Sequence, residues 1–243
     1  VTRFPVNRRR VERVLARQIR QRRREVGEAE AKEILRAYDF NVLPGEVVRS
    51  SEEAVSLAER ISYPVAMKIV SPDIIHKSDV GGVKLGLSNA QQVRDAYDLM
   101  MLRIPRRMPN AELTGVYLEQ MSTPGREVIL GMHRDAQFGP MLMFGLGGIF
   151  VEVMKDVSFH LAPITEEEAM QMLVGTRSYA LLKGARGQAA VDLSAIAGAL
   201  QRISQLVTDF PQIMEMDINP FIVGQVGHPP VVADARMTLS GVE

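Results

Sequence analysis

Cysteine is absent from the 243 residues of this chain. Without thiols the protein can form no disulfide bond, no thiolate metal site and no cysteine nucleophile. Apolar runs are short, and none approaches the roughly 18 residues that a membrane-spanning helix needs. The basic N-terminus is not followed by the apolar core and cleavage site of a signal peptide. With 46% hydrophobic and 24% charged residues, the composition is typical of a soluble globular protein, and we expect a cytoplasmic location and no membrane partner.

Two common nucleotide-binding motifs are also missing. The chain contains no Gly-x-x-x-x-Gly-Lys-Ser/Thr segment, so it is not a P-loop protein. The glycines at Gly145, Gly147 and Gly148 follow an expected strand, but Phe150 stands where a dinucleotide-binding fingerprint requires its third glycine. We interpret this segment as a structural turn.

The charge is zero overall but unevenly distributed. Residues 1–24 contain ten arginines and a single acid, Glu12. Basic arms of this kind can bind nucleic acid. Here Val11, Val14 and Leu15 recur at helical spacing, and the regular interleaving of aromatic side chains found in nucleic-acid-binding segments is missing. We therefore expect a helix that is solvated or docks on a partner, and no nucleic-acid partner.

Strand and helix periodicities alternate along the chain, which predicts an α/β protein. Helices are expected at 28–38, at 191–210 and after capping boxes that begin at Ser50, Ser88 and Thr165; strands are expected at 64–70, 83–87, 115–120, 127–132, 141–144, 213–218, 221–223 and 231–234. We predict a helical extension at 1–25, followed by one domain at 26–243. That domain divides into two α+β subdomains with mixed sheets, at about 26–115 and 116–243.

A polar loop between two strands is the first candidate site. An apolar strand delivers Lys68, and the loop carries His76 and a pair of glycines before a second strand delivers Lys84. Glycines let backbone N–H groups approach phosphate oxygens, and lysines supply positive charge. A neutral imidazole beside a polyphosphate can act as a nucleophile toward phosphorus. A surface hairpin with a chance histidine explains these residues equally well.

Two strand ends near the C-terminus form the second candidate. The segments Asp217-Ile-Asn219-Pro220 and Asp234-Ala-Arg would place Asn219 and Asp234 side by side across a hairpin. Such oxygen ligands suit Mg²⁺ that nucleotide phosphates also hold. A turn beside an unrelated acid is the simpler explanation when this pair is taken alone.

A third candidate is the end of the strand at 115–120. Glu119, Gln120 and Met121 lead into a short loop that could be a hinge with backbone groups for adenine, and Glu127 could bind ribose hydroxyls. Taken alone, this pattern carries little specificity.

Together these segments, in this order, resemble the ATP-grasp β subunit or β domain of nucleoside-diphosphate-forming acyl-CoA synthetases. The ADP-forming acetyl-CoA synthetases are the nearest type, and succinyl-CoA synthetase is a more distant relative. The resemblance runs from about Val26 to the C-terminus, and its most specific stretches are PVAMKIVSPDIIHKSDVGGVKLGL, GREVILGMHRDAQFGPMLMFGLGGIFVEVMKDVSFHLAPIT, GARG and MDINP with VADARM. It implies an ATP-grasp fold with nucleotide between the two subdomains. One departure is His160, where the family pattern has arginine.

The resemblance also implies roles for individual residues. The nucleotide contacts would be Lys68, Gly81, Gly82, Lys84 and Arg186 at the phosphates, Glu119, Gln120 and Met121 at adenine, and Glu127 at ribose. The Mg²⁺ ligands would be Asn219 and Asp234. His76 would carry a phosphoryl group, and Asp217 would steady the phosphohistidine.

These roles imply a ligase subunit that passes a phosphoryl group between a histidine and ADP or ATP, without excluding GDP or GTP. The CoA-binding α partner, which carries its own phosphorylatable histidine, would be a separate chain or a fused domain. Two other functions stay open: a regulatory module that binds nucleotide without turnover, and a self-sufficient ATP-grasp ligase.

Overall fold

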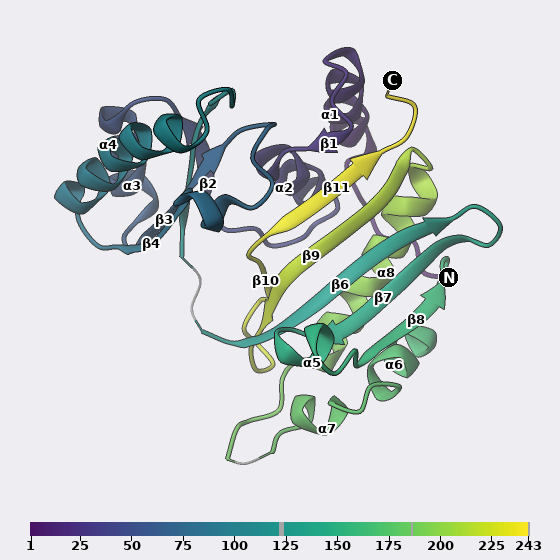
Figure 1. Cartoon of the computed structure of the whole chain (residues 1–243). Coiled ribbons are helices and arrows are strands. Elements are labelled where there is room, and N and C mark those ends of the chain that lie inside the picture. Colours follow the sequence, from purple (N-terminus) through teal and green to yellow (C-terminus); the bar gives the residue numbers. More distant parts are fainter. Residues whose placement is uncertain (122–123, 186, 243) are drawn as a thin grey trace. The chain divides into compact units, whose positions relative to one another are not determined.

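The computed structural model describes residues 1–121, 124–185 and 187–242. The chain forms two compact units, of which the first comprises Val1–Val42 and Pro124–Glu243 and the second comprises Leu43–Thr123 (Figure 1). The expected division near residue 115 would cut through the second unit, at the start of strand β5 (Gly115–Gln120), which pairs with two strands of that unit. The first unit therefore takes its chain from both ends of the sequence.

The first unit is built on an antiparallel sheet. Its strands lie in the order β1-β11-β9-β6-β7-β8, and β10 pairs with β9. Their bounds are β1 (Glu25–Val26), β6 (Arg126–Asp135), β7 (Gly139–Leu146), β8 (Val157–Leu161), β9 (Ile213–Val223), β10 (Val231–Val232) and β11 (Ala235–Leu239). The expectation of mixed sheets needs correction, since every named strand pair among the described residues is antiparallel. Short connections such as the one between β6 and β7 permit only this arrangement.

One face of this sheet is covered by helices α2 (Glu28–Ala37), α6 (Glu166–Val174) and α8 (Leu193–Asp209). Figure 1 shows α6 and α8 behind the sheet. Alternate residues of β6, namely Val128, Leu130 and Met132, are buried in one core cluster with Leu200 and Ile203 of α8. Each such buried aliphatic side chain contributes on the order of 1.5–3 kcal/mol. The residues between them on β6 point to the other face, because side chains alternate along a strand.

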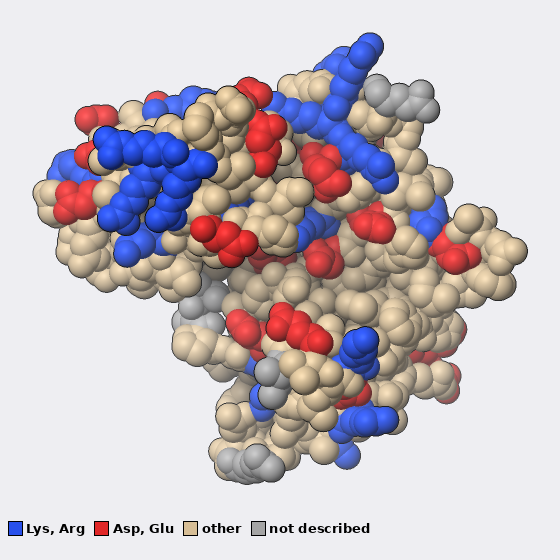
Figure 2. Space-filling model, in the orientation of Figure 1, with Lys and Arg blue, Asp and Glu red and all other residues tan. Residues whose placement is uncertain are grey.

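Helix α1 (Arg8–Arg20) is part of this unit's core and not an appended extension. Val11, Val14 and Leu15 are each at most 1% exposed and belong to the same cluster as the apolar residues of α2. The apolar stripe that the sequence reveals therefore docks on the chain itself. The arginines of the opposite helical face are exposed, and Figure 2 shows basic side chains projecting over α1.

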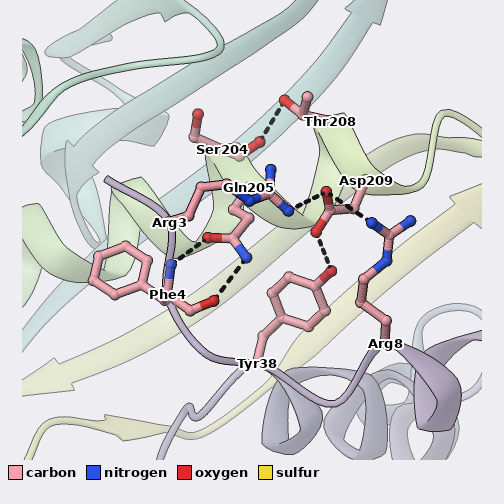
Figure 3. Close-up of polar contacts among 8 residues, drawn as sticks. All are labelled: Arg3, Phe4, Arg8, Tyr38, Ser204, Gln205, Thr208 and Asp209. Atoms are coloured by element: carbon pink, nitrogen blue, oxygen red, sulfur yellow. Dashed lines mark hydrogen bonds and ion pairs between the residues drawn. The ribbon is translucent and has the colours of Figure 1, made fainter. Parts of the chain in front are cut away.

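The segment before α1 is attached to the C-terminal end of α8 (Figure 3). The Gln205 side chain accepts a hydrogen bond from Phe4 N (2.7 Å) and donates one to Phe4 O (3.0 Å). The Asp209 carboxylate, whose side chain is 5% exposed, accepts a 2.6 Å hydrogen bond from the Tyr38 hydroxyl and lies 3.1 Å from an Arg3 nitrogen. Burial, followed by the hydrogen bond to Asp209, raises the pKa of Tyr38, so the hydroxyl stays protonated as the donor.

We expect Asp209→Ala to lower the free energy of unfolding by about 1–3 kcal/mol, because it leaves the Tyr38 hydroxyl and two arginines without their buried acceptor. Thermal and urea denaturation measure this loss. The matched control is Glu33→Ala, which also removes a carboxylate that contacts two arginines, Arg10 and Arg17, but at a more exposed position. The control should cost less than about 1 kcal/mol. Equal losses in the two variants would show that the Asp209 cluster adds nothing beyond surface ion pairs.

The second unit is a four-stranded antiparallel sheet in the order β2-β5-β3-β4. Besides β5 it contains β2 (Gly45–Val48), β3 (Val65–Val70) and β4 (Val83–Leu87), and helices α3 (Ser51–Ile61) and α4 (Ala90–Arg107) pack on it. Met67, Ile69 and Leu118 form its core with Leu57 and Ile104 of the helices. The intervening side chains of β3 and β5, which include Lys68 and Glu119, therefore point to the opposite face of the sheet.

Helix starts follow the sequence closely. The side chains of Ser50 and Thr165 accept hydrogen bonds from Glu53 N and Glu168 N, as their capping boxes predict. The start of α4 needs a correction, because Asn89 rather than Ser88 is its N-cap; the Asn89 Oδ1 accepts from Gln92 N at 2.9 Å. Asparagine and serine cap equally well, so neighbouring residues can compete for this position.

The sequence does not predict four of the strands, namely β1, β2, β8 and β11. Strand β8 lies at an edge, pairs only with β7 and is partly exposed, so its alternation is weak. Strand β2 is four residues long. Conversely, β9 runs through the Asn219-Pro220 step that the sequence treats as a break between two strands. Among the described helices, none combines the length and the apolar composition that a bilayer crossing requires.

Candidate functional site

The polar candidates of the first unit lie on the sheet face that points away from α6 and α8, which we call the open face. In the antiparallel register Gly131 of β6 stands opposite Asp217 of β9, and His133 stands opposite Glu215. Because alternate residues of β6 and β9 are buried against the helices, these polar residues share the other surface. The open face thus comprises Glu127, Gly131, His133, Glu215, Asp217 and Asn219 with their cross-strand neighbours.

A hollow of about 590 Å³ lies on the open face. His133, Glu215, Asp217 and Arg236 supply polar walls, and the apolar side chains come from Met141, Met143 and Phe159. All of these residues belong to the first unit. The hollow therefore combines charged groups with apolar surface, as ligand sites usually do.

Asp217 carries a half-buried carboxylate in this hollow. Burial raises the pKa of Asp217, Arg236 across the strand pair opposes that effect, and nearby Glu215 reinforces it. No hydrogen bond to the Asp217 side chain is found within the described residues. A desolvated carboxylate without a hydrogen-bond donor has acceptor capacity left for a ligand.

Asn219 and Asp234 lie side by side, as the hairpin argument predicts. The Asn219 N–H donates to the Asp234 carbonyl at 3.0 Å, and the Asp234 carboxylate accepts from Ala235 N at 2.8 Å. No group of three or more His, Asp or Glu side chains in the described part of the chain could by itself hold a metal ion. Two neighbouring oxygen-bearing side chains fit Mg²⁺ better than a full protein cage, because Mg²⁺ usually keeps waters and phosphate ligands.

In the second unit Lys68 and Glu119 are directly paired. The Lys68 Nζ lies 2.8 Å from Glu119 Oε1, with side chains 13% and 6% exposed. Their strands β3 and β5 are neighbours, and Ala66 rather than Lys68 stands directly opposite Glu119. The pair is thus diagonal across the sheet, and it holds the lysine ammonium in one place. The family resemblance implies that both residues contact the nucleotide, but nothing in the sequence predicts that they contact each other.

The backbone of the expected adenine hinge is largely engaged. Gln120 N donates to Pro44 O at 2.9 Å, and Met121 N donates to Pro64 O at 3.1 Å. The Met121 sulfur in turn accepts from Gly86 N of β4 at 3.0 Å. The segment that leaves β5 is therefore tied to the residues just before β2 and β3 and to β4 of its own sheet.

The loop between β3 and β4 contains a short 3-10 helix, η1 (Lys77–Val80), with His76 at its N-cap. His76 is exposed, and its side chain makes no capping hydrogen bond. Exposure leaves the imidazole accessible to a phosphoryl donor.

The two glycines of this loop have structural reasons of their own. Gly81 has a φ of 74°, a left-handed conformation that side chains disfavour. A Cβ on Gly82 would lie 2.5 Å from a carbon of Ile69. Their N–H groups donate to Ser78 O (3.2 Å) and Lys77 O (2.7 Å). These two donors are already used in this conformation, whereas Lys84 is exposed and accessible to a ligand.

The glycine-rich segment after β7 is a turn, as the sequence predicts. Gly148 has a φ of 69°, and Gly147 N donates to Glu127 O at 2.9 Å, which ties the turn to β6. Glu127 itself is exposed on the open face. Arg186, the remaining phosphate-contact candidate, lies outside the described residues.

Two histidines take different positions. His160 faces the helical side, where its Nε2 lies 2.8 Å from a Glu168 carboxylate oxygen, so its contact is with α6. His133 is 67% exposed on the open face, with its Nδ1 2.9 Å from Glu215 Oε1. Strand alternation is the reason, because Met132 and not His133 takes the buried position.

Arg236 and the His133–Glu215 pair are the open-face residues that sequence reasoning misses. The sequence does carry a signal for the exposure of His133 and Arg236, since they adjoin Met132 and Met237, whose apolar side chains take the buried positions. What the sequence lacks is the register, which sets Arg236 opposite Asp217. Only the paired strands reveal that these groups share one hollow.

Comparison with known proteins identifies the family. A family model described as an ATP-grasp domain matches residues 17–239. The β subunit of acetate–CoA ligase [ADP-forming] I from Pyrococcus furiosus is 48% identical over 212 residues, which cover 87% of this chain and 90% of that subunit. The acetate–CoA ligase [ADP-forming] I of Archaeoglobus fulgidus is 44% identical over 96% of this chain, which spans 34% of that longer protein.

A solved structure shows the same fold. Acetyl-coenzyme A synthetase 1 of Ca. Korarchaeum cryptofilum, with coenzyme A and Mg-AMPPCP and with its phosphohistidine segment pointing towards the nucleotide-binding site, superposes with a TM-score of 0.82 at 39% identity. The match covers 94% of this chain and 99% of that one. The chain therefore belongs to the ATP-grasp domain family, among the β subunits and β portions of ADP-forming acetate–CoA ligases.

Proposed function

We propose that this chain is the nucleotide-binding component of an ADP-forming acyl-CoA synthetase, and that it transfers a phosphoryl group between a phosphohistidine and Mg·ADP. The observation that carries the proposal is a group of polar side chains on β9 and beside it, on the open face. There a half-buried carboxylate, Asp217, lies two residues from Asn219, which is hydrogen-bonded to Asp234. An acid suited to imidazole and a pair suited to Mg²⁺ thus share the open face.

The partner is a CoA-binding component that carries the first phosphohistidine. Two observations on relatives support the existence of a further component. The Archaeoglobus ligase is a single chain of which this chain spans 34%, and the Pyrococcus protein is named a β subunit. The exposed arginines of α1 offer a basic surface on which an acidic partner could dock.

The transfer breaks one bond to phosphorus and forms one. The P–N bond of a phosphohistidine breaks while the other ring nitrogen carries a proton, and the electron pair of that bond stays on the nitrogen that held the phosphoryl group. A terminal phosphate oxygen of ADP forms the new P–O bond, so ATP and a neutral imidazole result. Because such a transition state is loose, positioning and charge neutralisation are the main contributions of the protein.

The residues of this chain divide these tasks. His76 accepts and releases the phosphoryl group, and Asp217 accepts a hydrogen bond from an imidazole ring nitrogen. Lys68, held by Glu119, and Lys84 donate to nucleotide phosphates. Asn219 and Asp234 would hold Mg²⁺, which when bound neutralises phosphate charge.

The test is reconstitution of the chain with a CoA-binding partner, acetyl-CoA, phosphate and Mg·ADP, with formation of ATP as the readout. We expect ATP formation and an acid-labile, base-stable phosphate on this chain. A chain that binds Mg·ADP but forms no ATP with any such partner would be a nucleotide-binding regulatory module, and the proposal would be wrong. Formation of ATP without a partner would instead indicate a self-sufficient ligase.

The metal pair gives this test a sharper form. We expect Asn219→Ala and Asp234→Ala to raise the Mg²⁺ concentration needed for half-maximal ATP formation by at least tenfold, because each removes one of two protein ligands. The midpoint of thermal unfolding should change little for the exposed Asn219. The control is Asn41→Ala, an exposed asparagine of the same unit. An unaltered Mg²⁺ dependence in both variants would remove the pair from the metal site.

A further inference from the structure

Arg236 on β11 is an open-face residue that the proposed function leaves without a role. It is exposed, and it stands directly opposite Asp217 in the antiparallel register of β9 and β11. Directly opposed residues of such a pair have Cβ atoms about 4.5–5.5 Å apart. Both residues line the hollow of about 590 Å³.

The two charges are neighbours without being bonded to each other. In the part of the chain that the structure describes, Arg236 has no carboxylate at ion-pair distance, and the Asp217 side chain has no hydrogen bond. An arginine whose task was to neutralise Asp217 would be expected to contact it in a two-pronged ion pair. Both groups therefore keep their hydrogen-bonding capacity for a ligand.

The charge balance of the hollow makes Arg236 decisive for an anion. Glu25, Asp135, Glu215 and Asp217 all line it, whereas Arg236 is the single Lys or Arg among its described lining residues. His133 is already engaged with Glu215. A phosphoryl group that entered without Arg236 would meet carboxylates and no permanent positive charge, so its binding would be unfavourable.

A phosphorylated imidazole matches this arrangement at both ends. One ring nitrogen bears the PO₃ group, and the other bears an N–H when the phosphorylated ring is protonated, which is the form that a neighbouring carboxylate favours. A carboxylate can accept from that N–H, and a guanidinium presents a planar fork of donors that fits phosphoryl oxygens. An aspartate and an arginine on adjacent strands can thus hold the two ends of one ligand.

We propose that Arg236 is the phosphoryl-binding residue of the open-face hollow, and that Arg236 and Asp217 together receive an N-phosphorylated imidazole. The proposal rests on the proposed phosphohistidine transfer and adds the group that holds the moving phosphoryl oxygens. The phosphohistidine of the partner and that of this chain share the same chemistry, and both are candidate ligands.

Direct binding to the full chain tests the assignment without turnover. The probes are phosphoramidate, whose PO₃ group is bonded to nitrogen, inorganic phosphate, and imidazole alone, each titrated by calorimetry. We expect Arg236→Ala to weaken phosphoramidate and phosphate binding at least tenfold and to leave imidazole binding unchanged. Arg236→Lys should fall between, because it keeps the charge and loses the fork. Arg20→Ala, at an exposed arginine of α1, is the control and should bind like the unaltered chain.

Equal phosphoramidate affinity in the unaltered chain and in Arg236→Ala would overturn the proposal, as would a matching loss of imidazole binding, which would point to a collapsed hollow. Single-turnover transfer to Mg·ADP then identifies the source of the ligand. A slower step in Arg236→Ala when only the partner is pre-phosphorylated indicates the partner's histidine, and a slower step from pre-phosphorylated chain indicates His76. Loss of phosphoramidate binding in a chain that never makes ATP would support the subsite while contradicting the proposed function.

Discussion

His76→Ala is expected to abolish net conversion of ADP to ATP in the reconstituted complex while leaving acyl-phosphate formation by the partner intact. The imidazole of His76 is exposed at the N-cap of η1 and makes no capping bond, so its loss should not disturb the loop. It is also the one histidine that lies between Lys68 and Lys84 in the chain, where it is flanked by the expected phosphate contacts. If it relays the phosphoryl group, that loop contains no second imidazole that could replace it.

Two measurements separate this expectation from its alternatives. Mass spectrometry under neutral conditions should find phosphate on the His76 peptide of the unaltered chain and none in His76→Ala. The control, His228→Ala, removes an exposed histidine from a turn of the first unit and should turn over normally. Undiminished ATP formation by His76→Ala would mean that the partner's histidine delivers directly to the nucleotide, and His76 would then be an ordinary loop residue.

Lys68→Ala is expected to weaken binding of Mg·ADP to the isolated chain at least tenfold, which corresponds to about 1.4 kcal/mol. The ammonium of Lys68 is held 2.8 Å from Glu119 Oε1, so it is positioned before any ligand arrives. A prepositioned charge loses less conformational entropy on binding than a free lysine would. Its removal should therefore weaken nucleotide binding more than loss of the exposed Lys84 does.

Calorimetric titration measures the affinity, and thermal unfolding of the same samples shows that the variants are folded. Lys68→Arg keeps the positive charge and should bind more tightly than Lys68→Ala. Lys183→Ala, which removes an exposed lysine of the first unit, serves as the control and should bind like the unaltered chain. An unaltered affinity in Lys68→Ala would exclude this lysine from the nucleotide site.

Much of the local architecture could be read from the sequence. The helix N-caps at Ser50 and Thr165 and the strand that carries Lys68 are determined by neighbours within a few residues. The hairpin proximity of Asn219 and Asp234 also follows from local pattern, because only a short connection separates their strands. The order of these segments along the chain was enough to identify the family.

Other features were decided by contacts between distant residues. The N-terminal arginine helix looks like a free arm in the sequence, yet Val11 and Leu15 are buried in the core that α8 also forms, and Gln205 and Asp209 hold the segment before it. A periodic apolar stripe shows that a helix has a buried face. It does not show whether another chain or the same chain covers that face.

The open face divides in the same way. Alternation along β6 and β9 already determines that His133, Glu215 and Asp217 point to one side of their strands. That His133 contacts Glu215, and that Arg236 stands opposite Asp217, depends on the register between strands far apart in sequence. A shift of one residue would move every one of these side chains to the other face, and only the packing of the whole sheet against its helices selects the register that is observed.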